Sequence, residues 1–151
     1  MFYYMSSVVN ICIASESGKK MEEMNSIKVI ANKGIVNDRY FKENNDKNIQ
    51  ITLIESENVD YYNKISGNNL IPTDFRRNVI TKGISLNELV GKEILLGEVK
   101  LKVHDLCEPC RYLQELLGEK NLVKKLLNRG GLRCELLTNG NIKINDLIRV
   151  L

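Results

Sequence analysis

The 151-residue sequence contains no apolar run close to the roughly 18 residues that a membrane-spanning helix requires. Residues 1–14 are apolar enough to suggest a signal peptide, but no basic residue precedes Lys19. Ser6, Ser7 and Asn10 also interrupt the apolar run. We therefore expect a first β-strand here rather than a cleaved leader, no membrane association and a cytoplasmic protein.

The sequence also lacks a strong excess of positive or negative charge. The chain has 22 Lys and Arg against 19 Asp and Glu, which gives a net charge of +3. This balance is too weak to indicate a nucleic-acid partner, although it fits a small anionic ligand.

Cysteine and histidine are few, with four cysteines and one histidine. Four cysteines in a chain of this length do not make a disulfide framework, so in a reducing compartment they are free, metal-bound or catalytic. Cys12 and Cys134 lie in apolar, strand-like runs, where we expect them to be small buried hydrophobic residues. Cys107 and Cys110 remain as the candidates for chemistry.

Short stretches of alternating apolar and polar residues predict that the chain is mainly β. Residues 93–103 are predicted to form two strands around Gly97-Glu98, with Val99, Leu101 and Val103 on one face. The other predicted strands are 27–31, 48–54, 78–81, 142–144 and 147–150.

Helical patterns are fewer. A short helix is predicted at 56–65, ending near Gly67, and a long one at 109–127, interrupted at Gly118. Ser85 and Glu88 have the spacing of a capping box at the start of a third helix. Without a βαβ rhythm, a repeat or a linker, the pattern predicts an α+β fold, mainly β and barrel-like, as one domain over residues 1–151.

The segment Cys107-Glu108-Pro109-Cys110 follows a predicted strand and opens the long predicted helix. Amides and the dipole at a helix N-terminus favour the thiolate form of a cysteine, which is the form that acts as nucleophile or soft metal ligand. The neighbouring Arg111 adds positive potential.

Three interpretations of this C-x-x-C remain open on spacing alone. In the first, both residues are ordinary thiols at a junction between a loop and a helix. In the second, they form a redox pair, but the alternating strands and helices of thioredoxin-type proteins are missing. The third interpretation is a zinc site, with His104 and Cys134 as the further ligands.

Two other segments carry arginines suited to anions. Arg76-Arg77-Asn78 precedes a predicted strand, and guanidinium groups bind phosphate or carboxylate through paired hydrogen bonds. Arg129 precedes Gly130-Gly131, which we interpret as the C-terminal stop of the long helix, with flexible backbone beside the arginine. Each segment is also compatible with a solvated basic turn.

A third polar segment, residues 34–40, contains an Asp38-Arg39 pair. Asp38 is expected to accept hydrogen bonds from amides of the turn.

Taken together and in order, these segments resemble the MOSC family, the domain shared with the C-terminal part of molybdenum-cofactor sulfurases. The resemblance extends from about Val29 to the end of the chain. The similar segments are 34–40, 50–55, 76–84, 89–92, 109–110, 129–131 and 140–148.

The resemblance implies a β-rich, barrel-like fold that binds the molybdenum cofactor, molybdopterin, or its sulfur. The family's cysteine, thought to carry a persulfide or to ligate molybdenum, matches Cys110, with Cys107 as the second choice. The residues implied in binding the phosphate-bearing pterin are Arg76, Arg77, Asn78, Thr81, Arg129, Gly130, Asp38 and Arg39.

The implied function is sulfur or cofactor transfer, or reduction of N-hydroxylated compounds by a small molybdoenzyme. Its protein partners would be cofactor-biosynthesis or electron-donor proteins. The alternative is a non-catalytic binding module, stabilised by zinc or sensing the cofactor, that uses Cys107 and Cys110.

Asn37 and Asn145 stand where the family usually has glycine. Asparagine is the non-glycine residue that best tolerates a left-handed backbone, so we expect both turns to be preserved.

Overall fold

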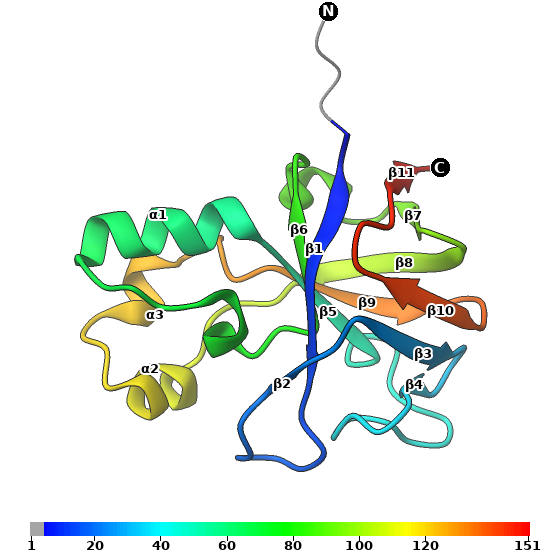
Figure 1. Ribbon diagram of the computed structural model, residues 1–151, viewed down its shortest axis with the longest axis horizontal. Coiled ribbons are helices and arrows are strands. Elements are labelled where there is room, and N and C mark those ends of the chain that lie inside the picture. Colours follow the sequence, from blue (N-terminus) through cyan, green and yellow to red (C-terminus); the bar gives the residue numbers. More distant parts are fainter. Residues whose placement is uncertain (1–4) are drawn as a thin grey trace, which may run out of the picture.

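In the computed structural model, which describes residues 5–151, the strands form two β-sheets that share one apolar core (Figure 1). The larger sheet has the spatial order β11 (Ile148–Val150), β7 (Glu93–Leu96), β8 (Val99–Leu106), β9 (Leu132–Leu136), β5 (Ile51–Glu55), β6 (Val79–Lys82), β1 (Ser7–Ile13) and β2 (Glu22–Glu23). The smaller sheet has the order β10 (Gly140–Lys143), β3 (Ser26–Ile30) and β4 (Gly34–Ile35).

Strand pairing in both sheets is antiparallel except between β5 and β6, which run parallel. The larger sheet curls into a half-barrel, which confirms the mainly β, barrel-like α+β prediction. On β8, Val99, Leu101 and Val103 are buried and the lysines between them are not, as the alternation predicted.

The central strands are buried on both faces. Successive residues of a strand point to opposite sides, so Leu53 and Val79 enter the core between the sheets. Their neighbours Ile54 and Ile80 enter a second apolar cluster, on the side of the helices.

The helices lie together on that second side (Figure 1). They are α1 (Ser56–Ser66), α2 (Arg111–Leu117) and α3 (Leu122–Lys125), with the 3-10 segment η1 (Pro72–Phe75). The other 3-10 segment, η2 (Leu86–Leu89), packs Leu86 and Leu89 into the core between the sheets instead. Tyr62 of α1 and Phe75 of η1 are fully buried there and meet edge to face, with ring centroids 5.8 Å apart.

Two helix predictions were wrong in detail. The predicted helix 109–127 is two short helices, because Gly118 takes a left-handed conformation that ends α2, and α2 begins at Arg111 rather than at Pro109. The capping box at Ser85 does not form, since Ser85 makes no side-chain capping hydrogen bond and the segment that follows it is only the short 3-10 turn η2.

The other elements agree with their predictions to within a few residues. The N-terminal strand predicted within 1–14 is β1, although residues 1–4 lie outside the described part of the chain. Asn37 and Asn145 have φ angles of 72° and 75°, so both turns have the expected left-handed backbone. In the span 5–151, no helix has the length and apolarity to cross a bilayer.

Gly130 and Gly131 do not end a helix, contrary to the sequence interpretation, because α3 already ends at Lys125. They allow two close backbone approaches instead. A Cβ on Gly130 would collide with the carbonyl oxygen of Cys107, and one on Gly131 would collide with that of Leu53. Gly131 also has a φ of 103°, which side chains rarely adopt.

We predict that Gly131→Ala lowers the free energy of unfolding by about 2–5 kcal/mol, since backbone strain and overpacking add. The matched control is Gly67→Ala, where φ is 74° but nothing lies within 4 Å of the new Cβ. Gly67→Ala should lower the free energy of unfolding only by the cost of backbone strain, about 1–2 kcal/mol. Urea denaturation of both variants measures the difference, and equal losses would contradict the close approach to Leu53.

Candidate functional site

A cavity of about 260 Å³ lies where the loop after β8 meets β5, β9 and the segments around Arg39 and Arg76. Five of the residues predicted for the site line it, namely Cys107, Cys110, Arg39, Arg76 and Arg77. The sequence-predicted thiols and three of the predicted arginines therefore share one space.

The two cysteines differ in exposure. Cys107 is 5% exposed, and its backbone N–H donates to the carbonyl of Gly131 at 2.7 Å. Cys110 is exposed and occupies the N-cap position of α2, with an extended backbone. The loop therefore presents Cys110 to solvent and keeps Cys107 in the wall of the cavity.

Arg77 ties the cysteine loop to its surroundings through backbone carbonyls. Its Nε donates to the carbonyl of Gly130 at 2.8 Å, and Nη2 donates to those of Cys107 at 3.1 Å and Glu108 at 3.4 Å. Nη1 donates to the carbonyl of Phe75 at 3.4 Å. Two of these four hydrogen bonds hold the cysteine loop in place, and the predicted role of Arg77 in ligand binding stays a prediction.

Asp38 is buried beside the cavity and orients Arg39. Its carboxylate accepts hydrogen bonds from the N–H groups of Ala14 and Tyr40, at 3.2 and 3.3 Å, as expected for a turn aspartate. It also pairs with Nη1 of Arg39 at 3.1 Å. Arg39 donates through Nη2 to the carbonyl of Arg76 at 3.2 Å.

Arg76 has a left-handed backbone with φ of 61° and ends the segment η1. Its Nη1 donates to the carbonyl of Lys19 at 2.7 Å. The Arg76 side chain lines the cysteine cavity and also a neighbouring one, so it lies between the two.

Asn78 and Thr81 lie in the interior rather than in the cavity lining. The side-chain oxygen of Asn78 accepts bonds from the N–H and hydroxyl of Thr52, and its amide donates to the carbonyl of Cys12. The hydroxyl of Thr81 is 3.5 Å from the carbonyl oxygen of Ile54. Their predicted contact with a ligand is untested, and the structure gives both residues internal partners.

Arg129 is placed apart from the cysteine cavity. It lines a different cavity, where Nη1 donates to the side-chain oxygen of Asn58 at 3.1 Å and the guanidinium lies 3.8 Å from the ring centroid of Tyr61. Glu55 lines the same cavity, and its burial raises the pKa of its carboxyl group above the usual value. Gly130, by contrast, packs closely against the backbone of Cys107 and Pro109 in the cysteine loop.

Sequence reasoning missed Arg133, which supplies a fourth guanidinium to the cysteine cavity. On β9, Leu132, Cys134 and Leu136 face the core, so Arg133 faces the other way and pairs in register with Thr52 of β5. The alternation could have revealed this orientation, but not which loops cover that face.

The groups considered for zinc are not brought together. Nε2 of His104 lies 2.8 Å from the carboxylate of Glu135, while Cys134 is fully buried and Cys110 is exposed. Across residues 5–151, no three His, Cys, Asp or Glu side chains gather closely enough to hold a metal ion.

The fold is similar to that of known structures. The YuaD protein from Bacillus subtilis has a TM-score of 0.84 at 19% identity, with 99% of this chain and 98% of that chain covered. YiiM from Geobacillus stearothermophilus has a TM-score of 0.79 at 15% identity, covering 97% and 75% of the two chains. YiiM from Escherichia coli has a TM-score of 0.71 at 15% identity, covering 100% and 70%.

No curated protein matches the sequence. The model of the MOSC domain family matches residues 41–149, a range that includes the cysteine loop, Arg76 and Arg133. The similar turn at 34–40, with Asp38 and Arg39, lies just before the matched range. Because the match spans well over half of the chain, and the fold agrees, this protein belongs to the MOSC domain family, which is associated with binding of the molybdenum cofactor.

Proposed function

We propose that the cysteine cavity binds the molybdenum cofactor and that Cys110 carries sulfur for it. One observation supports this most directly. An exposed thiol and four guanidinium groups line the same cavity of about 260 Å³, and among the lining residues of the described span 5–151 only Glu108 is a carboxylate. The excess of positive charge favours an anionic ligand, and the exposed thiol is available to exchange sulfur with it.

The residues present fit the chemistry of the cofactor. A phosphate-bearing pterin needs paired hydrogen-bond donors, which guanidinium groups supply, and molybdenum accepts soft sulfur ligands. Arg39 and Arg77 direct most of their donors to the protein itself. Arg76 and Arg133 form no ion pair with any residue in 5–151, so we assign phosphate binding to these two.

The bound cofactor would supply a molybdenum centre that accepts a sulfur ligand. Cys110 can receive this sulfur from an external donor because its side chain is exposed. Its thiolate attacks the outer sulfur of a persulfide, so a new S–S bond forms to Cys110 while the donor's S–S bond breaks and the donor leaves as a thiolate. The transfer leaves the total number of electrons on sulfur unchanged.

Exposure favours the carrier role over the reductase role that the family resemblance also implies. Sulfur exchange with a donor protein needs an accessible thiol, and Cys110 has one. Cys107 is too buried for such access, which is why we assign the carrier role to Cys110 alone.

We predict a fixed order of thiol alkylation in the native protein. Near pH 8, iodoacetamide should modify Cys110 first and Cys107 much more slowly. Cys12 and Cys134 should react only after unfolding, because burial raises the pKa of Cys12 to about 12 and also raises that of Cys134. Peptide mass spectrometry follows each site, and faster reaction at Cys107 would contradict the assignment.

The carrier role predicts that Cys110→Ser abolishes sulfur loading. Wild-type protein incubated with a small polysulfide should gain one sulfur atom at Cys110, detected by intact mass and by its loss on reduction. Cys107→Ser should still load, which separates the two cysteines. Loading that persists in Cys110→Ser would overturn the proposal.

Cofactor binding predicts that protein purified from a cofactor-competent host contains molybdenum and fluorescent pterin. Arg133→Gln should weaken cofactor retention about tenfold or more, since a hydrogen bond to a charged group contributes about 1.5–3 kcal/mol. Arg149→Gln, on the exposed part of β11, is the matched control and should bind normally. Absence of both molybdenum and pterin from the wild-type protein would contradict cofactor binding.

A further inference from the structure

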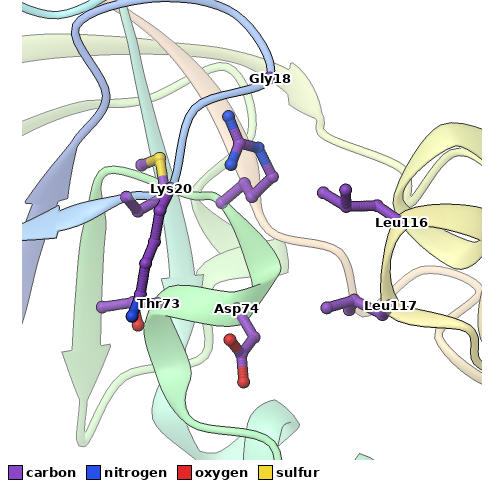
Figure 2. A pocket seen from close by; sticks show the side chains of 8 residues that line it. Gly18, Lys20, Thr73, Asp74, Leu116 and Leu117 are labelled. Atoms are coloured by element: carbon purple, nitrogen blue, oxygen red, sulfur yellow. The ribbon is translucent and has the colours of Figure 1, made fainter.

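A second cavity of about 250 Å³ adjoins the cysteine cavity and shares Arg76 with it. It opens between the loop that leads into β2, the segment η1 and the C-terminal half of α2 (Figure 2). Apart from Arg76, no residue of its lining has been assigned a role so far.

One wall of the second cavity is apolar. Leu116 and Leu117 project from α2 toward the segment that carries Asp74, as Figure 2 shows. Leu116 is 48% exposed, so its side chain is available to a ligand. With the buried Met21 they form a surface suited to a hydrocarbon chain or ring.

The rest of the lining carries two cations and one carboxylate. Lys20 and Arg76 form no ion pair within the described span of the chain. The carboxylate of Asp74 accepts the backbone N–H of Ile71 at 2.9 Å, which satisfies part of its hydrogen-bonding capacity. The excess of positive charge therefore favours an anionic group over a cationic one.

We propose that the second cavity binds a small amphipathic anion, an organic carboxylate with an aliphatic chain. Its hydrocarbon part contacts Leu116 and Leu117, and its carboxylate lies between Lys20 and Arg76. The space of about 250 Å³ holds roughly eight groups of water size, which matches a six-carbon acid.

The position of Arg76 relates this ligand to the cysteine cavity. Cys110 precedes the first residue of α2, and Leu116 and Leu117 end it, so one helix borders both cavities. Over six residues a helix rises about 9 Å, so the two cavities border opposite ends of α2. A carboxylate held by Arg76 therefore faces toward the space beside Cys110.

The proposal is tested by NMR titration of the methyl groups of Leu116, Leu117 and Thr73 with three probes of similar size. Hexanoate should give saturable shifts at these methyls, whereas hexylamine and hexanol should bind at least several-fold more weakly. Equal or tighter binding of hexylamine or hexanol, shifts confined to other residues, or no saturation with hexanoate would overturn the proposal.

Two variants and their controls localise the binding. Lys20→Glu should raise the Kd for hexanoate about fivefold or more, because an exposed ion pair contributes up to about fivefold and reversal adds repulsion. Leu116→Gln should weaken binding as well, while Lys28→Glu, on β3 of the smaller sheet, should not. If Lys28→Glu weakens binding as much as Lys20→Glu, the charge effect is not local and the proposal fails.

Cys110→Ser separates this proposal from the carrier function. The variant should bind hexanoate like the wild type, because Cys110 does not line the second cavity. Loss of hexanoate binding in Cys110→Ser would contradict the assignment of the ligand to this cavity. Failure of sulfur loading at Cys110 would leave the hexanoate result unaffected.

Discussion

The arrangement of the site depends on the hydrogen bonds from Arg77 to four backbone carbonyls. The loop 107–110 forms no regular secondary structure, and the carbonyl oxygens of Cys107 and Glu108 take a donor from Arg77. One planar guanidinium satisfies two of them and also binds the carbonyl of Gly130. Because Arg77 immediately precedes Asn78 and β6, the loop is fixed relative to the centre of the larger sheet.

This attachment explains the glycines that follow Arg129. The loop and residues 130–131 approach so closely that a side chain at Gly130 would meet the carbonyl of Cys107. The N–H of Cys107 in turn donates to the carbonyl of Gly131. Contact between these two segments, which are distant in sequence, holds the loop with its buried Cys107 and exposed Cys110 at the cavity. Arg76 and Arg133 supply positive charge to the same cavity.

Much of the fold follows from the sequence, because alternation such as that of Val99, Leu101 and Val103 fixes which face of a strand is buried. The cysteine segment and Arg76-Arg77 could also be identified before the structure. The separate roles of the arginines could not be predicted, because long-range packing decides that Arg77 binds carbonyls and that Arg129 contacts Tyr61. Long-range packing also gives the N–H of Leu86 its acceptor, the carboxylate of Glu55 31 positions earlier, which the local pattern around Ser85 does not reveal.

The most direct test of this account measures the alkylation rate of Cys107 in Arg77→Lys, with Arg149→Lys as the control on an exposed strand. Lysine keeps the charge but cannot bind several carbonyls in one plane. If Arg77 holds the loop, Cys107 becomes readily alkylated in Arg77→Lys while thermal unfolding shows a folded protein. An unchanged alkylation rate at Cys107 in the folded variant would contradict the central role of Arg77.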